Sequence, residues 1–165
     1  MPERWVLNDS PLIVLSRIAH EGMLFALADE VVVPRAVATE IEAGPAEDRA
    51  RQVLSEGRLA LVDTPPPTAE LLAWDLGSGE TAVLSFALSH VGWTAILDDA
   101  AARKCAQSLS IRVKGTLALV LMARQQELIP SAAEVLRLLR ASGFRIDDQT
   151  IRDALRQTVN EEWLS

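Results

Sequence analysis

The chain has little of what stabilises small extracellular folds or anchors a protein in a membrane. It contains one cysteine in 165 residues, which excludes an internal disulfide and a Cys-rich zinc site. Tyrosine is absent and aromatic residues make up 4% of the chain, so the 49% of hydrophobic residues predict an aliphatic core. No uncharged run approaches the ~18 residues of a transmembrane helix, and charged residues precede any apolar stretch. We therefore expect one cytoplasmic domain over residues 1–165, with no membrane partner.

Positive charge is also scarce, because 16 Lys and Arg residues face 23 Asp and Glu residues, for a net charge of −7. This balance opposes non-specific attraction to nucleic-acid phosphates. A nucleic-acid-binding role would need positive charge from a divalent cation, a basic partner or a local cluster. The candidate cluster comprises Arg103, Lys104, Arg112, Lys114 and Arg124. These residues could equally be scattered over a solvated surface.

Short apolar runs rich in β-branched residues alternate with longer helical patterns. This alternation predicts βαβ units and a parallel sheet of four or five strands. The four expected strands cover residues 5–9, 31–34, 59–63 and 94–98, and a fifth candidate covers residues 111–114.

Local signals also predict where several helices begin. Ser10 before Pro11 is typical of an N-cap, and Ser131 with Glu134 predicts a capping box. After residue 99, small and apolar residues recur at helical spacing and place Cys105 in the core.

Acidic residues fall at the ends of the expected strands. Asp9 ends the first strand, and the adjacent Asp98 and Asp99 end the fourth. Glu80 opens the helix before the fourth strand, and Glu40 lies on the helix after the second. Each alone has a simpler interpretation as a cap or a surface residue. Acids at the carboxyl ends of parallel strands share one crevice, however, where a divalent cation with oxygen ligands relieves their repulsion.

Several motifs in this order resemble the DUF3368 family, a PIN-like family related to the VapC toxin nucleases of toxin–antitoxin modules. The resemblance covers about residues 8–160 and rests on "LNDSPLIVLSRI", "VPRAVATEIEAGP", "LGSGETAVLSFAL", "AILDDAAARKCAQSLSIRVKGTLALVLMARQQELI" and "GFRIDDQTIRDAL". It implies a PIN-like three-layer α/β/α sandwich. It also implies a metal-dependent nuclease, using Mg²⁺ or Mn²⁺, that hydrolyses RNA.

The resemblance also assigns roles to positions of this chain. It implies catalytic acids at Asp9, Glu40, Glu80 and Asp99, and metal ligands at Asp9, Glu80, Asp98 and Asp99. Asp99 fits the fourth-strand aspartate best, and Asp98 is the alternative or an additional ligand. The acids would hold one or two cations, which activate a water for in-line displacement at phosphorus.

Three further residues are candidates for binding substrate. Ser10 contacts phosphate or caps a helix, and Arg103 pairs with phosphate or with Asp99 one turn earlier. Thr116 offers a hydroxyl to the pocket.

The chain as a toxin nuclease would have an RNA substrate, an antitoxin partner and, from the resemblance, a homodimeric state. The competing hypothesis is a catalytically weak or inactive PIN-fold module that binds an antitoxin-like protein or nucleic acid. Retention of all four acid positions favours the enzyme, whereas the charge of −7 suits a basic binding partner.

Overall fold

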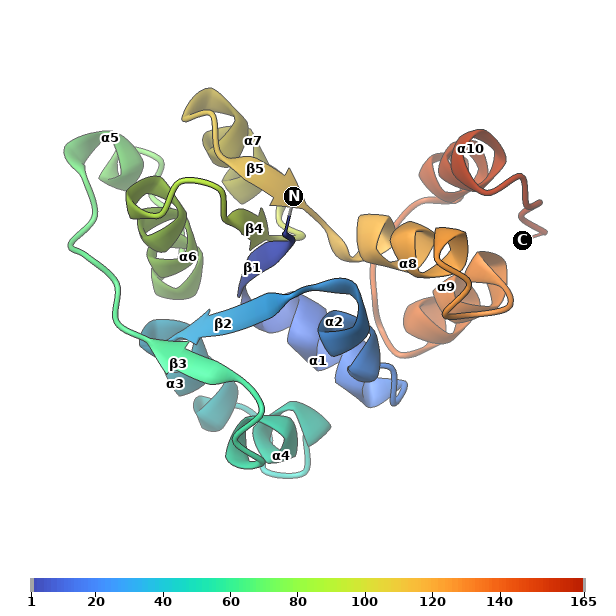
Figure 1. Cartoon of the computed structure of the whole chain (residues 1–165), viewed down its shortest axis with the longest axis horizontal. Helices are drawn as coiled ribbons and strands as arrows, with labels where there is room; N and C mark the ends of the chain where they lie inside the picture. Colours follow the sequence, from blue (N-terminus) through green and yellow to red (C-terminus); the bar gives the residue numbers. More distant parts are fainter. Residues whose placement is uncertain (1, 165) are drawn as a thin grey trace.

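A parallel sheet of five strands forms the centre of the protein, in a computed structural model that describes residues 2–164. The strand order is β3-β2-β1-β4-β5 (Figure 1). The strands are β1 (Arg4–Leu7), β2 (Glu30–Pro34), β3 (Ala60–Val62), β4 (Thr94–Ile96) and β5 (Arg112–Lys114). The parallel sheet predicted from the sequence is confirmed, including its fifth strand. Asp9 and Asp98, which the prediction placed at strand ends, lie just beyond them.

The order in which the chain adds strands to the sheet reverses between β1 and β4. The chain begins at β1 in the middle of the sheet, proceeds to β2 and β3 on one side, and returns to β4 and β5 on the other. Leu7 of β1 pairs with Ile96 of β4, and the Asn8 amide donates to the Ile96 carbonyl at 3.2 Å. Open α/β sheets bind ligands at such a switch point, beyond the carboxyl ends of the strands.

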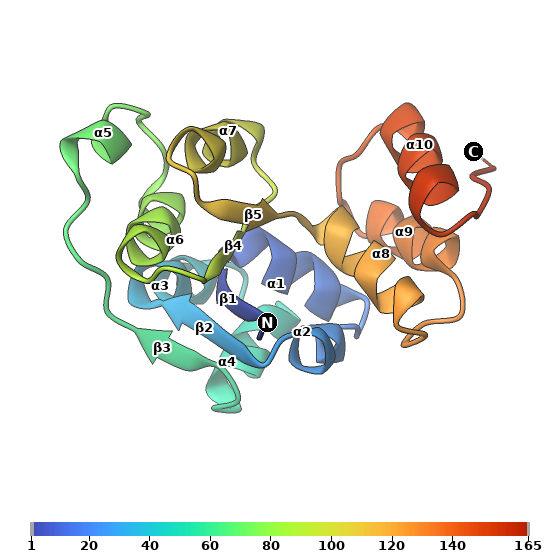
Figure 2. The same cartoon turned by 45° about the horizontal axis from the view of Figure 1, so that its top comes forward.

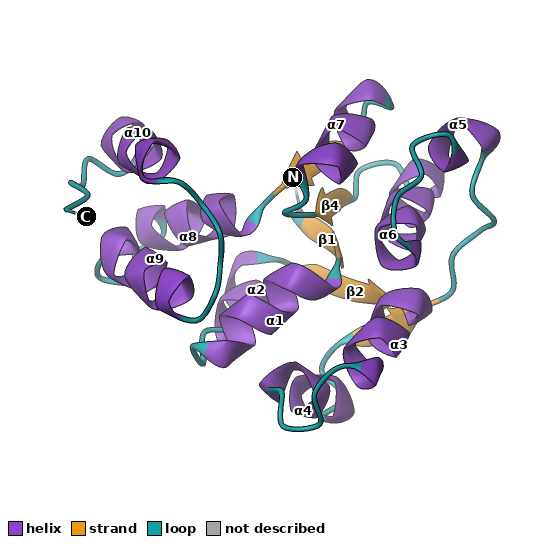
Figure 3. Cartoon of the chain, turned by 180° about the vertical axis from the view of Figure 1, so that it is seen from behind, coloured by secondary structure: helices purple, strands orange, loops and turns teal. Residues whose placement is uncertain are grey.

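Helices cover both faces of the sheet and complete a three-layer α/β/α sandwich (Figures 1 and 3). The helix α6 packs against β1, β2 and β4, and α3 packs against β2, β3 and α6. Because both faces are covered, Trp5, Val6 and Leu7 are all fully buried, as expected for a parallel strand. The first seven helices are α1 (Asp9–Arg17), α2 (Gly22–Leu27), α3 (Arg35–Ala43), α4 (Arg49–Ser55), α5 (Ala69–Leu72), α6 (Ser78–Ser89) and α7 (Ala100–Ser108).

The last three helices gather at one end of the molecule, on the side of β5 and away from β3 (Figures 1 and 2). They are α8 (Thr116–Gln125), α9 (Ala132–Ala141) and α10 (Asp148–Thr158). The connection from α9 to α10 runs along the side of this group that faces α1 (Figure 3). Among residues 2–164, no helix combines the length and the apolar character needed to cross a membrane.

The predicted helix starts are partly confirmed. Ser131 caps α9, because its hydroxyl accepts from the Glu134 amide at 3.2 Å, and Cys105 is fully buried. The Ser10 prediction is wrong. The helix α1 begins at Asp9 with Asn8 in the cap position, and the Ser10 hydroxyl lies inside the helix and donates to Asp98 at 3.0 Å.

Candidate functional site

Two pairs of polar residues meet where β1 and β4 end. Asn8 and Asp9 follow β1, while Asp98 and Asp99 follow β4. Because these strands are parallel neighbours in register, their carboxyl ends place the two pairs side by side. Pairing of the strands thus joins residues that are about 90 positions apart in the sequence.

Glu40 reaches the same region from α3 and docks on the start of α6. Its Oε1 accepts from the Ser78 hydroxyl at 3.0 Å and from the Gly79 amide at 2.9 Å. A Cβ at position 79 would lie 2.5 Å from Glu40 Oε2, so any larger residue there would push the Glu40 carboxylate aside. The start of α6 also favours a negative charge there, because its first amides are unpaired and its dipole is positive. The same helix start carries Glu80 in its first turn.

Burial and the charges of neighbouring acids raise the pKa of two carboxyl groups at this edge of the sheet, Asp9 and Glu80. Burial raises the pKa of Asp9, and the nearby Glu40 carboxylate raises it further. Burial also raises the pKa of Glu80, followed by repulsion from Asp99, Asp9 and Glu40. These four carboxylates therefore form one acidic cluster, which we define as Asp9, Glu40, Glu80 and Asp99.

Asp98 has different partners from its neighbour. Its Oδ1 accepts from the Thr116 amide at 2.7 Å, and its Oδ2 accepts from the hydroxyls of Thr116 and Ser10 at 2.7 and 3.0 Å. Asp98 thus joins the end of β4 to the starts of α1 and α8. Asp99 caps α7 through a bond from the Ala102 amide to Oδ2 at 3.0 Å.

This network gives Thr116, predicted as a substrate-binding residue, a structural partner. Its side chain is fully buried, and both its amide and its hydroxyl donate to Asp98. It therefore supports the site from behind and has no free group for a substrate. Ser10 lines the acidic pocket and its hydroxyl donates to Asp98, so a contact between Ser10 and phosphate, which stays a prediction, would have to replace this bond.

A cavity of about 340 Å³ opens in front of the acids, and we call it the acidic pocket. Asp9, Glu80 and Asp99 line it, whereas Glu40 lies outside its lining and acts on it through charge. The remaining wall comes from Asn8, Ser10, Val14, Asp98, Gly143, Phe144 and Arg145. The C-terminal helices therefore contribute to the pocket through the α9–α10 connection.

The oxygen donors of the acidic pocket fit a hard divalent cation. Asn8 is 4% exposed, lines the pocket, and leaves its Oδ1 without a hydrogen-bond partner. A buried unpaired amide oxygen is costly, and a cation or a bound water would satisfy it. Within residues 2–164, no three acidic, histidine or cysteine side chains converge closely enough to surround one ion as they stand.

One of the two sequence-based interpretations paired Arg103 with Asp99, and the structure does not contain this ion pair. Among the described residues, it forms no ion pair with any carboxylate. Its guanidinium lies against Gly115, and a side chain at that position would overlap it. Arg103 lines a second hollow beside the acidic pocket, together with Asp98, Phe144 and Arg145.

The sequence-based prediction missed Asn8, Phe144 and Arg145. Asn8 carries a recognisable signal, because it is the first polar residue after an apolar strand and directly precedes Asp9. Phe144 and Arg145 carry none, since only the return of the α9–α10 connection brings them to the strand ends.

Comparison with known proteins agrees with this geometry. No curated protein matches the chain. The model of the DUF3368 family, described as a PIN domain, matches residues 4–160, which is nearly the whole chain. With a five-stranded parallel sheet and acids at its switch point, the chain belongs to the DUF3368 family of PIN domains.

Proposed function

We propose that the protein is a metal-dependent endoribonuclease that hydrolyses RNA phosphodiester bonds with Mg²⁺ or Mn²⁺. The PIN domain is a nuclease-type fold, which supports phosphodiester hydrolysis at a coarse level. The observation that carries the finer proposal is one pocket lined by Asp9, Glu80, Asp99 and the unpaired Asn8 Oδ1. Burial and neighbouring carboxylates raise the pKa of Asp9 and of Glu80 there. Their mutual repulsion is relieved when a divalent cation binds.

The residues in and around the acidic pocket would have different roles in binding the cation and in positioning the groups that hold it. Asp9, Glu80 and Asp99 would hold the cation, with Asn8 Oδ1 as a neutral oxygen donor. A bound divalent cation lowers the pKa of a water and stabilises charge on phosphate oxygens. Glu40 of α3 keeps the pocket negative from its contact with the start of α6, and Asp98 joins the end of β4 to the starts of α1 and α8 around it. No side-chain nucleophile is required.

The test is cleavage of a panel of structured RNAs by the purified protein with Mg²⁺, Mn²⁺ or EDTA. We expect cleavage only with the metals, and loss of cleavage in the double variant Asp9→Asn, Asp99→Asn. The matched control is Glu42→Gln with Asp153→Asn, which removes two exposed carboxylates outside the pocket. Cleavage in EDTA, or equal cleavage by the Asp9 and Asp99 variant, would contradict the mechanism.

A second candidate is a weakly active or inactive binding module. It is favoured by the two carboxylates that are already committed to hydrogen bonds, Glu40 to α6 and Asp98 to Thr116. Isothermal titration with Mn²⁺ separates the candidates independently of turnover. Absence of both Mn²⁺ binding and cleavage of every substrate would contradict the nuclease and favour the binding module.

We also propose a role as the toxin of a toxin–antitoxin pair, with an antitoxin protein as partner and a homodimer as the working form. The net charge of −7 supports a basic protein partner. Expression of the chain in a bacterial host, with and without the Asp9 and Asp99 substitutions, tests this role through growth. Normal growth despite soluble, metal-active protein would argue against a toxin.

A further inference from the structure

A second hollow of about 570 Å³ lies beside the acidic pocket, between α7 and the α9–α10 connection. We call it the α7 groove and define it by Asp98, Arg103, Lys104, Phe144 and Arg145, which line it. Three of these residues, Asp98, Phe144 and Arg145, also line the acidic pocket. The two hollows are therefore neighbours with a shared wall, and a chain-like ligand in one can continue into the other.

The α7 groove is locally positive in an acidic protein. Arg103, Lys104 and Arg145 form no ion pair with any carboxylate among the described residues. The groove also holds two carboxylates, Asp98 and Asp147, which accept hydrogen bonds from Thr116 and Thr150, so three positive charges outnumber two negative ones along its lining. Three free cations next to an acidic pocket complement a polyanion whose reacting phosphate would lie in that pocket.

Phe144 adds an apolar surface to this positive groove. Its ring is half-buried, packs against the core from the α9–α10 connection and lines both hollows. Aromatic rings beside cationic side chains are typical of sites that bind single strands, because an unpaired base stacks on the ring. In a duplex, by contrast, the bases are already stacked on one another.

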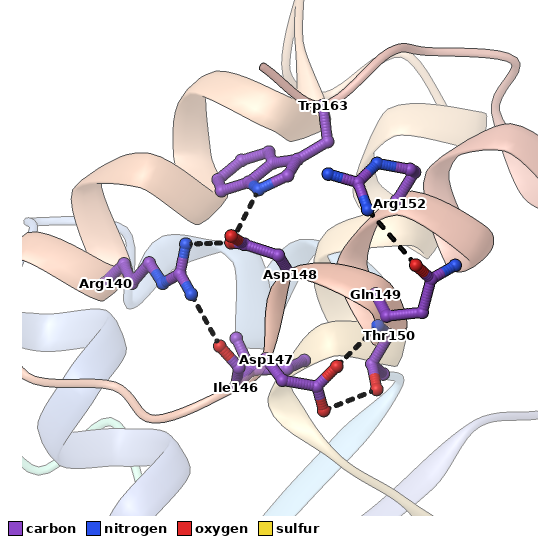
Figure 4. A network of polar contacts seen from close by, with 8 residues as sticks. All are labelled: Arg140, Ile146, Asp147, Asp148, Gln149, Thr150, Arg152 and Trp163. Carbon is purple, nitrogen blue, oxygen red and sulfur yellow. Dashed lines mark hydrogen bonds and ion pairs between the residues drawn. The ribbon is translucent and has the colours of Figure 1, made fainter. Parts of the chain in front are cut away.

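A network of polar contacts holds the α9–α10 connection in place (Figure 4). Arg140 of α9 donates to the Ile146 carbonyl at 3.1 Å and to the Asp148 carboxylate, which also accepts from the Trp163 indole at 3.0 Å. At the other end, the amides of Gly143 and Phe144 donate to the carbonyls of Arg140 and Leu139 of α9 at 3.1 and 3.0 Å. Because the connection is fixed at both ends, Phe144 and Arg145 lie in a set position before any ligand binds.

We propose that the α7 groove binds a single-stranded segment of nucleic acid that leads away from the acidic pocket. Phosphates of the strand lie against Arg103, Lys104 and Arg145. One unpaired base stacks on Phe144. This inference rests on the proposed nuclease function for the direction of the strand, while binding in the groove itself requires neither metal nor cleavage.

The test is fluorescence anisotropy of short labelled oligonucleotides, measured in EDTA over a series of KCl concentrations. Lys104→Ala and Arg145→Ala should each weaken binding and reduce the slope of log K against log salt by about 0.7, as expected for one lost phosphate contact on a single strand. Arg156→Ala is the matched control, because it removes an exposed positive charge from the last turn of α10, outside the groove. It should leave both quantities nearly unchanged.

Phe144→Leu separates stacking from charge. We expect binding to weaken about fivefold or more, with the same salt slope, because one base loses its aromatic partner. Leucine keeps most of the packing against the core, and a thermal melt of the variant checks that it folds. A duplex of the same sequence should bind more weakly than the single strand, and RNA and DNA oligonucleotides show which sugar the groove prefers.

Equal binding by wild type, Lys104→Ala and Arg145→Ala would overturn the inference, as would a preference for the duplex. Failure of the groove proposal and failure of the nuclease proposal give different results. A protein that binds single strands through these residues but cleaves nothing with Mn²⁺ contradicts the proposed function and supports the groove. Metal-dependent cleavage that is unaffected in all three groove variants contradicts the groove alone.

Discussion

Asp98 and Asp99 are adjacent in the chain, yet the structure gives their carboxylates different surroundings. Both oxygens of Asp98 accept hydrogen bonds from residues of α1 and α8. Asp99 uses one oxygen to cap α7 and acts on Glu80 through its charge. The charge-assisted bonds of Asp98 stabilise the fold. Asp99 keeps one carboxylate oxygen available for a ligand.

Substituting the two aspartates one at a time should separate stability from metal binding. Asp99→Asn should change the free energy of unfolding by less than about 0.5 kcal/mol, because asparagine caps helices as well as aspartate does. Its Mn²⁺ affinity should fall at least about tenfold, since even the loss of an outer partner of a metal ligand costs that much. Asp98→Asn should instead lower the free energy of unfolding by about 1–3 kcal/mol, because an amide group meets donors that need an acceptor.

Urea unfolding and titration calorimetry with Mn²⁺ measure the two effects on the same preparations. The reverse pattern, with Asp98→Asn stable but poor in metal binding, would assign the ligand to Asp98.

Among the secondary-structure elements, α9 depends on a residue far along the chain. The sequence predicted a capping box in which Glu134 complements Ser131, and the serine does cap the helix. Glu161 takes the acceptor role at this helix start, with bonds from the amides of Ala132 and Ala133 at 3.0 Å each. It also accepts from the Ser131 hydroxyl at 3.1 Å and pairs with Arg124 of α8 at 3.2 Å. The C-terminal segment is thereby fastened to α8 and α9.

Glu161→Gln should lower the free energy of unfolding by about 2 kcal/mol at neutral pH, because a neutral amide accepts weaker bonds than a carboxylate. Burial opposes ionisation of Glu161, but the Ala133 and Ala132 amides, Ser131 and Arg124 outweigh it and lower its pKa below 4.5. Its contribution is therefore fully present above pH 4.5 and is lost as the pH falls through the lowered pKa.

The difference between the Glu161→Gln variant and wild type should shrink accordingly when unfolding is repeated in acid. Glu162→Gln, one residue later and exposed, is the control and should show almost no effect. A pH-independent difference would mean that the Glu161 charge is not what stabilises α9.

For the whole molecule, the acidic cluster links stability to pH and to metal. Asp9 has a raised pKa, so its ionisation destabilises the fold once the pH rises above its ordinary value of 3.8 and through the raised one. In EDTA, wild type should therefore lose stability relative to Asp9→Asn as the pH rises over this range. The same relative loss should be absent at pH values below 3.8, where the group is protonated in both states.

Mn²⁺ should reverse this loss, because it binds the folded protein and neutralises the cluster. At about a hundredfold excess over its dissociation constant, a ligand stabilises by about 2.7 kcal/mol, which raises the Tm of a chain of this size by about 5–10 °C. Differential scanning fluorimetry with EDTA, Mg²⁺ and Mn²⁺ measures the shift. A Tm unchanged by either metal in wild type would contradict metal binding at this site.

Local patterns in the sequence were enough to predict four strands with a candidate fifth, their parallel pairing and the region in which acids gather. These features follow from local patterns, namely short apolar runs, helix punctuation and polar residues directly after strands, and they bring Asp9 and Asp99 to one edge of any such sheet. The helix cap at Asp99 could also be predicted from local sequence, because a capping bond joins residues only three positions apart.

The hydrogen-bond partners of the acids depend on tertiary packing. Asp98 bonds to Thr116, Glu40 docks on Gly79 and Glu161 caps α9, and in each case the partner is between 18 and 39 positions away. Such contacts depend on how helices pack after the sheet has formed, and no local pattern encodes them. The α7 groove is the clearest case, since Phe144 and Arg145 face the strand ends only because the last three helices return the chain to them.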